Sequence, residues 1–198
     1  MKKLSPFIII FSFLSFFNFA YSQDGPEVWS LTYNNQSRIY AMVIDPVNQN
    51  IIYEAGLDSG IYKTTNTGLN WSPVNNGLTY NKVQCLSISL SNPLVLYAGT
   101  DQLDATNSGI YKTTNGGNNW TYVSTGITDS KGIQSIAIHP TNPNIAWAAV
   151  FDGLVPSTVG VFKTTDGGAN WFASSNGIDI KNILTVIVNP LNGNCLYL

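Results

Sequence analysis

Four stretches of the chain alternate apolar residues with polar or small ones, and each predicts a short strand with one buried face. They run over residues 39–44, 83–88, 133–138 and 183–188. The apolar face consists of Met42, Ile44, Leu86, Ile88, Ile136, Ile138, Val186 and Val188. A period of two indicates strands, and no stretch of helical period lies between the Gly, Pro and Asn residues. The pattern therefore predicts an all-β fold.

Each of these strands opens a longer repeated unit. A turn rich in Pro and Asn follows, and a second strand then carries an aromatic residue at a fixed position: Tyr53, Tyr97, Trp147 and Tyr197. On the other face of the first strand, one position is always small: Ala41, Cys85, Ser135 and Thr185. Small side chains there would let neighbouring units approach closely.

The most specific part of the unit is a turn of pattern T-x-[ND]-x-G-x-x-W, present in three copies. Its residues are Thr64, Asn66, Gly68 and Trp71, then Thr113, Asn115, Gly117 and Trp120, then Thr164, Asp166, Gly168 and Trp171. Asn and Asp can bond their own backbone, and Gly accepts a positive φ. The Trp begins the returning strand, where its ring can pack beneath the turn and its indole N–H can find an acceptor. The motif predicts a hairpin between the third and fourth strands of each unit.

These three turns resemble the Asp-box, or bacterial neuraminidase repeat, of β-propeller blades. The resemblance implies blades of four antiparallel strands, as in sialidases, family 74 xyloglucanases, sortilin-type receptors and photosystem II assembly factors. Trp29, Trp71, Trp120 and Trp171 are 42, 49 and 51 residues apart, and periods of this length are typical of propeller blades. The resemblance indicates the fold and leaves the function open, because one fold hosts many functions.

The repeats predict whole blades over 39–74, 83–123 and 133–173, a fourth strand at Trp29 and a partial blade from Ile183. A propeller closes with about four to eight blades. We therefore expect the chain to be the N-terminal part of a longer propeller, truncated at its C-terminal end. The alternative is an open arc that closes by dimerisation, and the sequence leaves the oligomeric state open.

The N-terminal 22 residues have the features of a signal peptide. Lys2 and Lys3 precede an apolar run over 7–20, and Ser22 ends a stretch with small residues suited to cleavage. The run is shorter than the roughly 20 residues that a spanning helix needs, and no Cys follows the cleavage point to carry a lipid. We expect residues 23–198 to form the propeller, secreted or on the cell surface, with no membrane span.

Composition argues against several other partners. Nine Lys and Arg against eleven Asp and Glu give a net charge of −2, so there is no basic footprint for nucleic acid. Exported cysteines often pair, but Cys85 and Cys195 align with apolar or small strand residues, which predicts buried free thiols in different blades. His139 aligns with Asp45, Ser89 and Asn189 and is expected to bond a turn backbone. We therefore expect no metal and no cofactor.

The loops that join the second strand to the third, and one blade to the next, should lie at the end opposite the Asp-box turns. Function in propellers is expected on such loops, which a rigid scaffold positions. The loops carry four residues predicted to bind a ligand: Asp101, Asp104, Phe151 and Asp152.

Asp58 is the candidate catalytic residue. It precedes a Gly-aromatic strand, in a place similar to the catalytic Asp of family 74 enzymes, although the fuller motif around it is missing. The competing interpretation is that Asp suits any tight loop. A sialidase would hold its substrate carboxylate with three arginines, and this chain has only Arg38.

The sequence favours an exported, non-catalytic propeller module that binds or scaffolds a glycan or an extracellular protein. The alternative is a fragment of a secreted glycoside hydrolase, xyloglucanase-like or sialidase-like, in which two carboxylates flank the sugar bond. An additional inward-facing carboxylate or an arginine cluster in further blades would distinguish the two.

Overall fold

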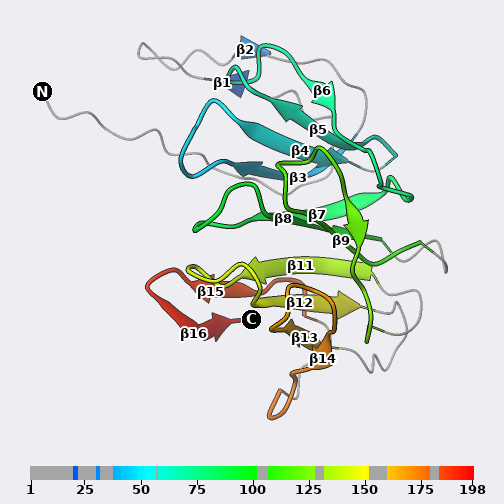
Figure 1. Cartoon of the computed structure of the whole chain (residues 1–198), viewed down its shortest axis with the longest axis vertical. Coiled ribbons are helices and arrows are strands. Elements are labelled where there is room, and N and C mark those ends of the chain that lie inside the picture. Colours follow the sequence, from blue (N-terminus) through cyan, green and yellow to red (C-terminus); the bar gives the residue numbers. More distant parts are fainter. Residues whose placement is uncertain are drawn as a thin grey trace, which may run out of the picture.

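Every regular element in the described part of the chain is a β-strand. The computed structural model describes residues 38–56, 58–101, 107–127, 132–151, 160–178 and 183–198, and the backbone of β1 (Ala20–Tyr21) and β2 (Ser30–Leu31), which pair antiparallel. The predicted signal peptide lies outside these residues apart from β1. Figure 1 shows the sheets stacked as successive layers along the long axis of the molecule.

Three sheets have four antiparallel strands each, in the order of the sequence. The first consists of β3 (Ile39–Ile44), β4 (Ile52–Gly56), β5 (Gly60–Thr64) and β6 (Ser72–Pro73). The second consists of β7 (Val83–Ile88), β8 (Leu96–Thr100), β9 (Ile110–Thr113) and β10 (Thr121–Tyr122). The third consists of β11 (Gly132–Ile138), β12 (Ala146–Phe151), β13 (Val161–Thr164) and β14 (Phe172–Ala173). The predicted all-β architecture of four-stranded blades is confirmed.

A fourth, partial blade contains β15 (Ile187–Asn189) and β16 (Asn192–Tyr197). Its first strand is shorter than the predicted 183–188, because the pairing with β16 begins only at Ile187 opposite Tyr197. Ile183 and Val186 nevertheless lie buried against the third blade, and the partly buried Leu196 packs beside them. The packing of this segment therefore follows the repeat even where its hydrogen bonds do not.

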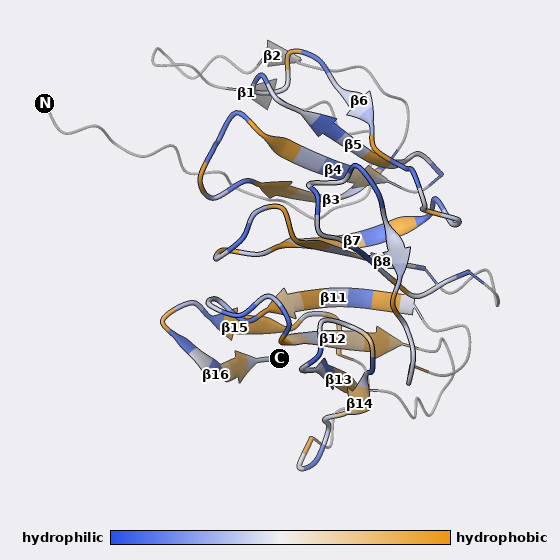
Figure 2. Cartoon of the chain, in the orientation of Figure 1, coloured by the Kyte–Doolittle hydropathy of each residue, from blue (hydrophilic) through white to orange (hydrophobic). Residues whose placement is uncertain are grey.

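Apolar side chains fill the space between successive blades. Figure 2 shows hydrophobic residues along β4, β11 and β12. The small residues of the first strands also link blades by hydrogen bonds. Cys85 Sγ donates to Ile133 O at 3.3 Å, and Ser135 Oγ accepts from Val186 N at 3.2 Å. Cys85 and Cys195 are both free thiols, as predicted, but Cys195 is only half-buried. It lies on β16, which pairs with β15 alone among the described strands.

The first strand of each whole blade is irregular at one place. The register with the second strand shifts between Ile39 and Ala41, between Val83 and Cys85, and between Ile133 and Ser135. Tyr40, Gln84 and Gln134 therefore each stand on a β-bulge. Bulges re-aim side chains and are over-represented beside functional sites.

Candidate ligand-binding face

The two ends of the blades differ in character. One end, the turn end, carries the turns between the first and second strands and the T-x-[ND]-x-G-x-x-W turns. The other, the loop end, carries the loops between the second and third strands and between blades; it is the right-hand edge in Figure 1.

The repeated turns are closed by their own hydrogen bonds. In the second copy, Thr113 Oγ1 donates to Asn115 Oδ1 at 2.8 Å and accepts from Gly117 N at 3.1 Å, and Asn119 N donates to Asn115 Oδ1 at 2.9 Å. The same three bonds recur in the first and third copies. Trp120 and Trp171 are 2% and 1% exposed. These two tryptophans hold the blades together and leave no face for a sugar, whereas Trp71 of the first turn is half-buried.

Asp166 is the one carboxylate among the three turns. Hydrogen bonds from the Asn170 side chain and backbone, and from Thr164, lower the pKa of Asp166 to about 2. The carboxylate is therefore ionised at neutral pH and serves as an acceptor for the turn.

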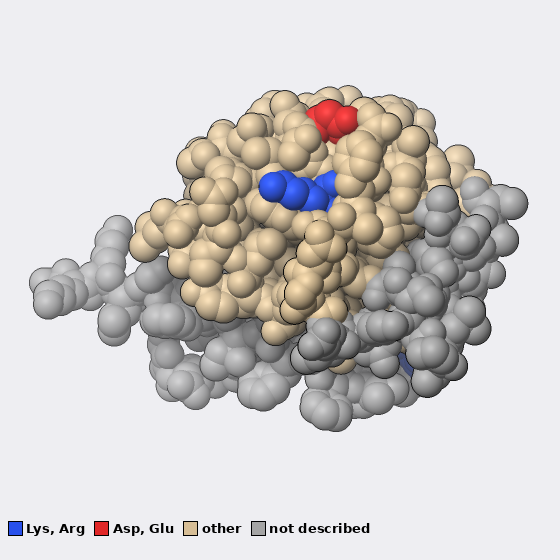
Figure 3. Space-filling model, turned by 90° about the horizontal axis from the view of Figure 1, so that it is seen from below, with Lys and Arg blue, Asp and Glu red and all other residues tan. Residues whose placement is uncertain are grey.

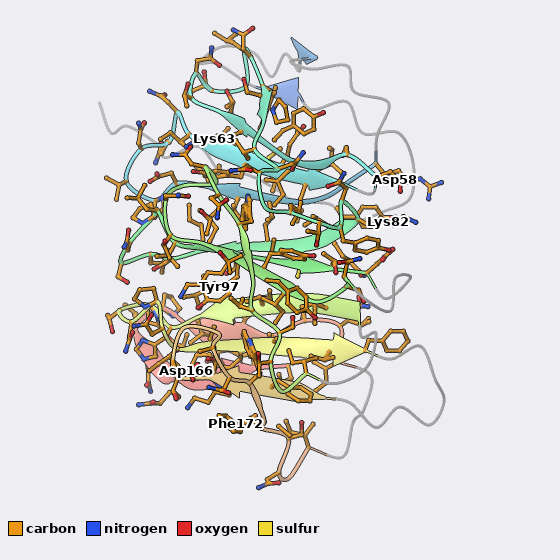
Figure 4. All side chains as sticks on the ribbon, turned by 45° about the vertical axis from the view of Figure 1, so that its right-hand side comes forward. Asp58, Lys63, Lys82, Tyr97, Asp166 and Phe172 are labelled. Carbon is orange, nitrogen blue, oxygen red and sulfur yellow. The ribbon has the colours of Figure 1, made fainter. Side chains whose placement is uncertain are left out.

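Asp58 lies at the loop end, where its carboxylate is 3.7 Å from Lys82 Nζ (Figure 4). Its φ of 71° is left-handed, a conformation in which Asn and Asp are enriched among non-glycine residues. The geometry therefore accounts for Asp58 as a turn residue with an ion pair to the next blade. A surface pair of this kind contributes about 0–1 kcal/mol.

Asp101 is also engaged by the chain itself. Its Oδ1 accepts from Tyr80 Oη at 2.6 Å, and its backbone N donates to Lys82 O at 3.0 Å. Phe151 ends β12, where it pairs with Gly132 and is half-buried. Of the predicted ligand-binding residues, Asp104 and Asp152 lie outside the described residues.

The bulges bring together polar residues that the motif analysis did not single out. Gln84 Nε2 donates to Gln134 Oε1 at 2.8 Å, across the second and third blades. Tyr40 occupies the corresponding place in the first blade and is 46% exposed. The available signal was the polar residue directly before each small residue of the first strand, at Ala41, Cys85 and Ser135.

Glu54 is a second residue that the sequence analysis missed. It is 1% exposed on β4, and neither carboxylate oxygen meets a hydrogen-bond partner among the described residues. Burial raises the pKa of Glu54 to about 7. The corresponding positions of the next two blades hold Ala98 and Ala148. A carboxyl this buried cannot touch a substrate, so Glu54 belongs to the packing of the first blade.

His139 bonds the turn that follows it, as predicted: its Nδ1 accepts from Thr141 N at 3.3 Å. Within the described residues, no group of three or more His, Cys, Asp or Glu side chains is placed to hold a metal ion. In the same residues no helix is long and apolar enough to span a membrane.

Comparison with known proteins relates the chain to propellers. No protein-family model and no curated protein matches the sequence. An ancestral GH74 enzyme is similar over 81% of this chain, with 28% identity and a TM-score of 0.62. The GH74 enzyme of Niastella koreensis is similar over 85%, with 22% identity and a TM-score of 0.63. An auxiliary nutrient binding protein from Bacteroides thetaiotaomicron is similar over 80%, with 18% identity and a TM-score of 0.57.

The chain spans 21%, 31% and 35% of the length of these three proteins, respectively. Four-stranded antiparallel sheets, stacked face to face and similar to these structures, identify the chain as a β-propeller protein.

Proposed function

We propose that this chain is the ligand-binding part of an exported Asp-box propeller that catalyses no reaction. Its ligand is a neutral glycan, bound at the loop end. The main support for this proposal is that the described carboxylates of the loop end are bound by other side chains of the protein. Asp58 and Asp101, the described carboxylates of the loop end, are held by Lys82 and Tyr80 respectively. Glycosidases instead direct two carboxylates at one sugar bond, about 5–10 Å apart.

The side chains on the bulges suit a hydroxyl-rich ligand. Gln84 and Gln134 offer amide donors and acceptors without charge, and Tyr40 adds an exposed aromatic ring with a hydroxyl. An aromatic face and a few polar groups are the usual composition of a binding site for a small or chain-like ligand. Asp101, Asp104, Phe151 and Asp152 remain further candidates for ligand binding on the sequence pattern alone.

The binding of neutral and acidic polysaccharides, xyloglucan among them, by the secreted protein tests this function. We expect binding of a neutral polysaccharide without release of reducing ends. Tyr40→Ala should weaken binding about tenfold, as loss of an aromatic anchor commonly does. Tyr122→Ala is the matched control, because Tyr122 is 48% exposed on the outer strand β10. Equal effects of the two substitutions would contradict the proposed face.

A glycoside hydrolase is the second candidate, supported by the 28% identity to an ancestral GH74 enzyme. In this case the protein would release reducing ends, and Asp58→Ala would abolish the release while leaving binding in place.

Export is tested separately by N-terminal sequencing of the product, which should begin at Gln23.

A further inference from the structure

Gln84 and Gln134 form a hydrogen-bonded amide pair on the first strands of two neighbouring blades. β7 lies beside β11, and Gln84 Nε2 donates to Gln134 Oε1 at 2.8 Å although the two residues are 50 positions apart. Both side chains are half-buried. Each residue stands on a β-bulge, which redirects a side chain from the regular alternation of its strand. The two bulges therefore bring the amides into contact with each other.

The backbone next to the pair is held in place by a buried contact. Cys85, the residue after Gln84, donates from its Sγ to the carbonyl of Ile133, the residue before Gln134, at 3.3 Å. Cys85 and Ile133 are both buried. Gly99 of β8 packs against both, and a Cβ there would overlap Cys85 Sγ and the Ile133 side chain. The amide pair is thus preorganised, so less conformational freedom remains to be lost when a ligand binds.

The pair leaves one acceptor and one donor group for a ligand. Gln84 Oε1 can accept and Gln134 Nε2 can donate, and neither atom bonds to a described group. Neither belongs to the buried polar atoms that lack a partner in the described part of the chain, so both reach solvent. If both amides were turned over, Gln134 Oε1 would be the free acceptor and Gln84 Nε2 the free donor. The pair therefore offers the same combination in either orientation.

A vicinal diol, two hydroxyls on adjacent carbons, matches this combination. One hydroxyl donates to the amide oxygen, and its neighbour accepts from the amide nitrogen. A peptide backbone also carries a donor and an acceptor, but an extended peptide binds a sheet as an added strand along a regular edge. The bulges interrupt the regular strand geometry of β7 and β11 at the amide pair. The geometry therefore favours a sugar over an extended peptide.

Tyr40 adds an aromatic ring on the next first strand. It stands on the bulge of β3, at the place that Gln84 and Gln134 occupy on β7 and β11, and β3 lies beside β7. Its side chain is exposed. An aromatic ring beside a few hydrogen-bonding groups suits a sugar ring, which has an apolar C–H face and hydroxyls around its rim.

Charge near the pair is low. Lys82, two residues before Gln84, lies with its Nζ 3.7 Å from the carboxylate of Asp58. The described surface seen from below also carries little charge (Figure 3). Arg38, two residues before Tyr40, is exposed. A neutral sugar is therefore favoured, and Arg38 is the cation whose contribution an experiment must separate.

We propose that Gln84 and Gln134 together bind a vicinal diol of a neutral sugar unit, with Tyr40 against the same sugar chain. The proposal rests on the proposed function, because the diol belongs to the neutral glycan bound at the loop end. It specifies how the protein selects among such glycans. Units with free hydroxyls on adjacent carbons bind, and units in which a linkage takes one of these hydroxyls do not.

Two hexasaccharides of glucose, titrated against the full chain by calorimetry, test this selection. Cellohexaose, with β-1,4 links, keeps the hydroxyls of C2 and C3 free in every unit. Laminarihexaose, with β-1,3 links, has no free hydroxyls on adjacent carbons in its internal units. We expect cellohexaose to bind at least about tenfold more tightly, because two hydrogen bonds depend on the diol.

Substitution of the glutamines tests the pair itself. Gln84→Met and Gln134→Met should each weaken cellohexaose binding about tenfold and leave the binding of laminarihexaose unchanged. The double variant should bind about as well as either single one, because each amide positions the other. Gln49→Met is the matched control, since Gln49 is an exposed glutamine at the turn end. Losses that add in the double variant would contradict the pair as the binding unit.

The remaining outcomes separate this proposal from the proposed function. Equal binding of the two hexasaccharides, weakened by Tyr40→Ala, would overturn the diol and leave the neutral-glycan function in place. Absence of binding to every neutral glycan would overturn both. Binding of polygalacturonate that is lost in Arg38→Ala and kept in Gln84→Met would replace the neutral sugar by an acidic one. Binding of a Gly-Ser repeat peptide that depends on Gln84 would assign the amides to a peptide backbone and refute the diol.

Discussion

Thr67 is the weak residue of the first turn. It holds a φ of 58°, whereas Gly116 and Gly167 hold 66° and 77° at the same place in the other two turns. A β-branched residue in the left-handed region is strained, at a cost of about 1–3 kcal/mol. Thr67 Oγ1 offsets part of this cost by donating to Asn66 O at 2.6 Å.

Thr67→Gly should therefore raise the free energy of unfolding by about 1 kcal/mol, as measured by urea denaturation. The reciprocal Gly116→Thr is the control and should lower it. Destabilisation by Thr67→Gly would show that the hydroxyl bond outweighs the backbone strain.

At the scale of the element, the second T-x-[ND]-x-G-x-x-W turn depends on one buried hydroxyl, that of Thr113. Thr113 is 1% exposed, and its Oγ1 accepts from the buried Gly117 N–H at 3.1 Å. Thr113→Val keeps the shape and leaves that N–H without a partner, which should cost about 1–3 kcal/mol. Thermal and urea unfolding measure the loss. The neighbouring Thr114 is exposed, so Thr114→Val is the matched control and should change stability by less than about 0.5 kcal/mol. A similar cost for the two variants would argue against the hydrogen bond as the cause.

The distance along the sequence between contacting residues explains which elements the sequence could predict. The turns and the role of His139 rest on contacts within a few residues, such as Thr113 with Asn115, so their spacing is visible in the sequence. The four-stranded blades were predictable because the same unit recurs along the chain. The contacts of Lys63 and Lys112 with the carbonyls of Gly116 and Gly167, and the Gln84–Gln134 pair, join residues about 50 or more positions apart. Nothing local marks the lysine contacts, because a lysine on a strand is by default a solvated side chain; the glutamines are marked only by their place before the small residue of each first strand. The bulges were missed for a related reason, since they are visible only in the register between two strands.

Glu54 controls how the whole molecule should respond to pH. Tyr53 and Ala55, on either side, pack toward the second blade, so the alternation of the strand directs Glu54 to the opposite face of the first blade. Burial raises the pKa of its carboxyl from 4.5 to about 7 in the folded protein. The unfolded chain loses this proton near pH 4.5, while the folded chain keeps it up to about pH 7.

Glu54 should therefore lower stability as pH rises from about 4.5 to about 7, by about 3 kcal/mol in all, with no further change above that range. Asp166 acts in the opposite sense at lower pH: its depressed pKa stabilises the fold above pH 3.8, and this effect is lost as pH falls toward 2.

Urea unfolding at pH 4.5, 6 and 8 measures the Glu54 effect apart from that of Asp166. Glu54→Ala, which installs the residue of the next two blades, should remove the loss between pH 4.5 and 7 and be more stable than the native chain at pH 8. Asp166→Asn, which installs the residue found at Asn66 and Asn115, should leave the loss of stability between pH 4.5 and 7 unchanged. If Glu54→Ala still lost stability between pH 4.5 and 7, another group would be responsible for the loss. Glu54 of the native chain would then be a carboxylate with a partner.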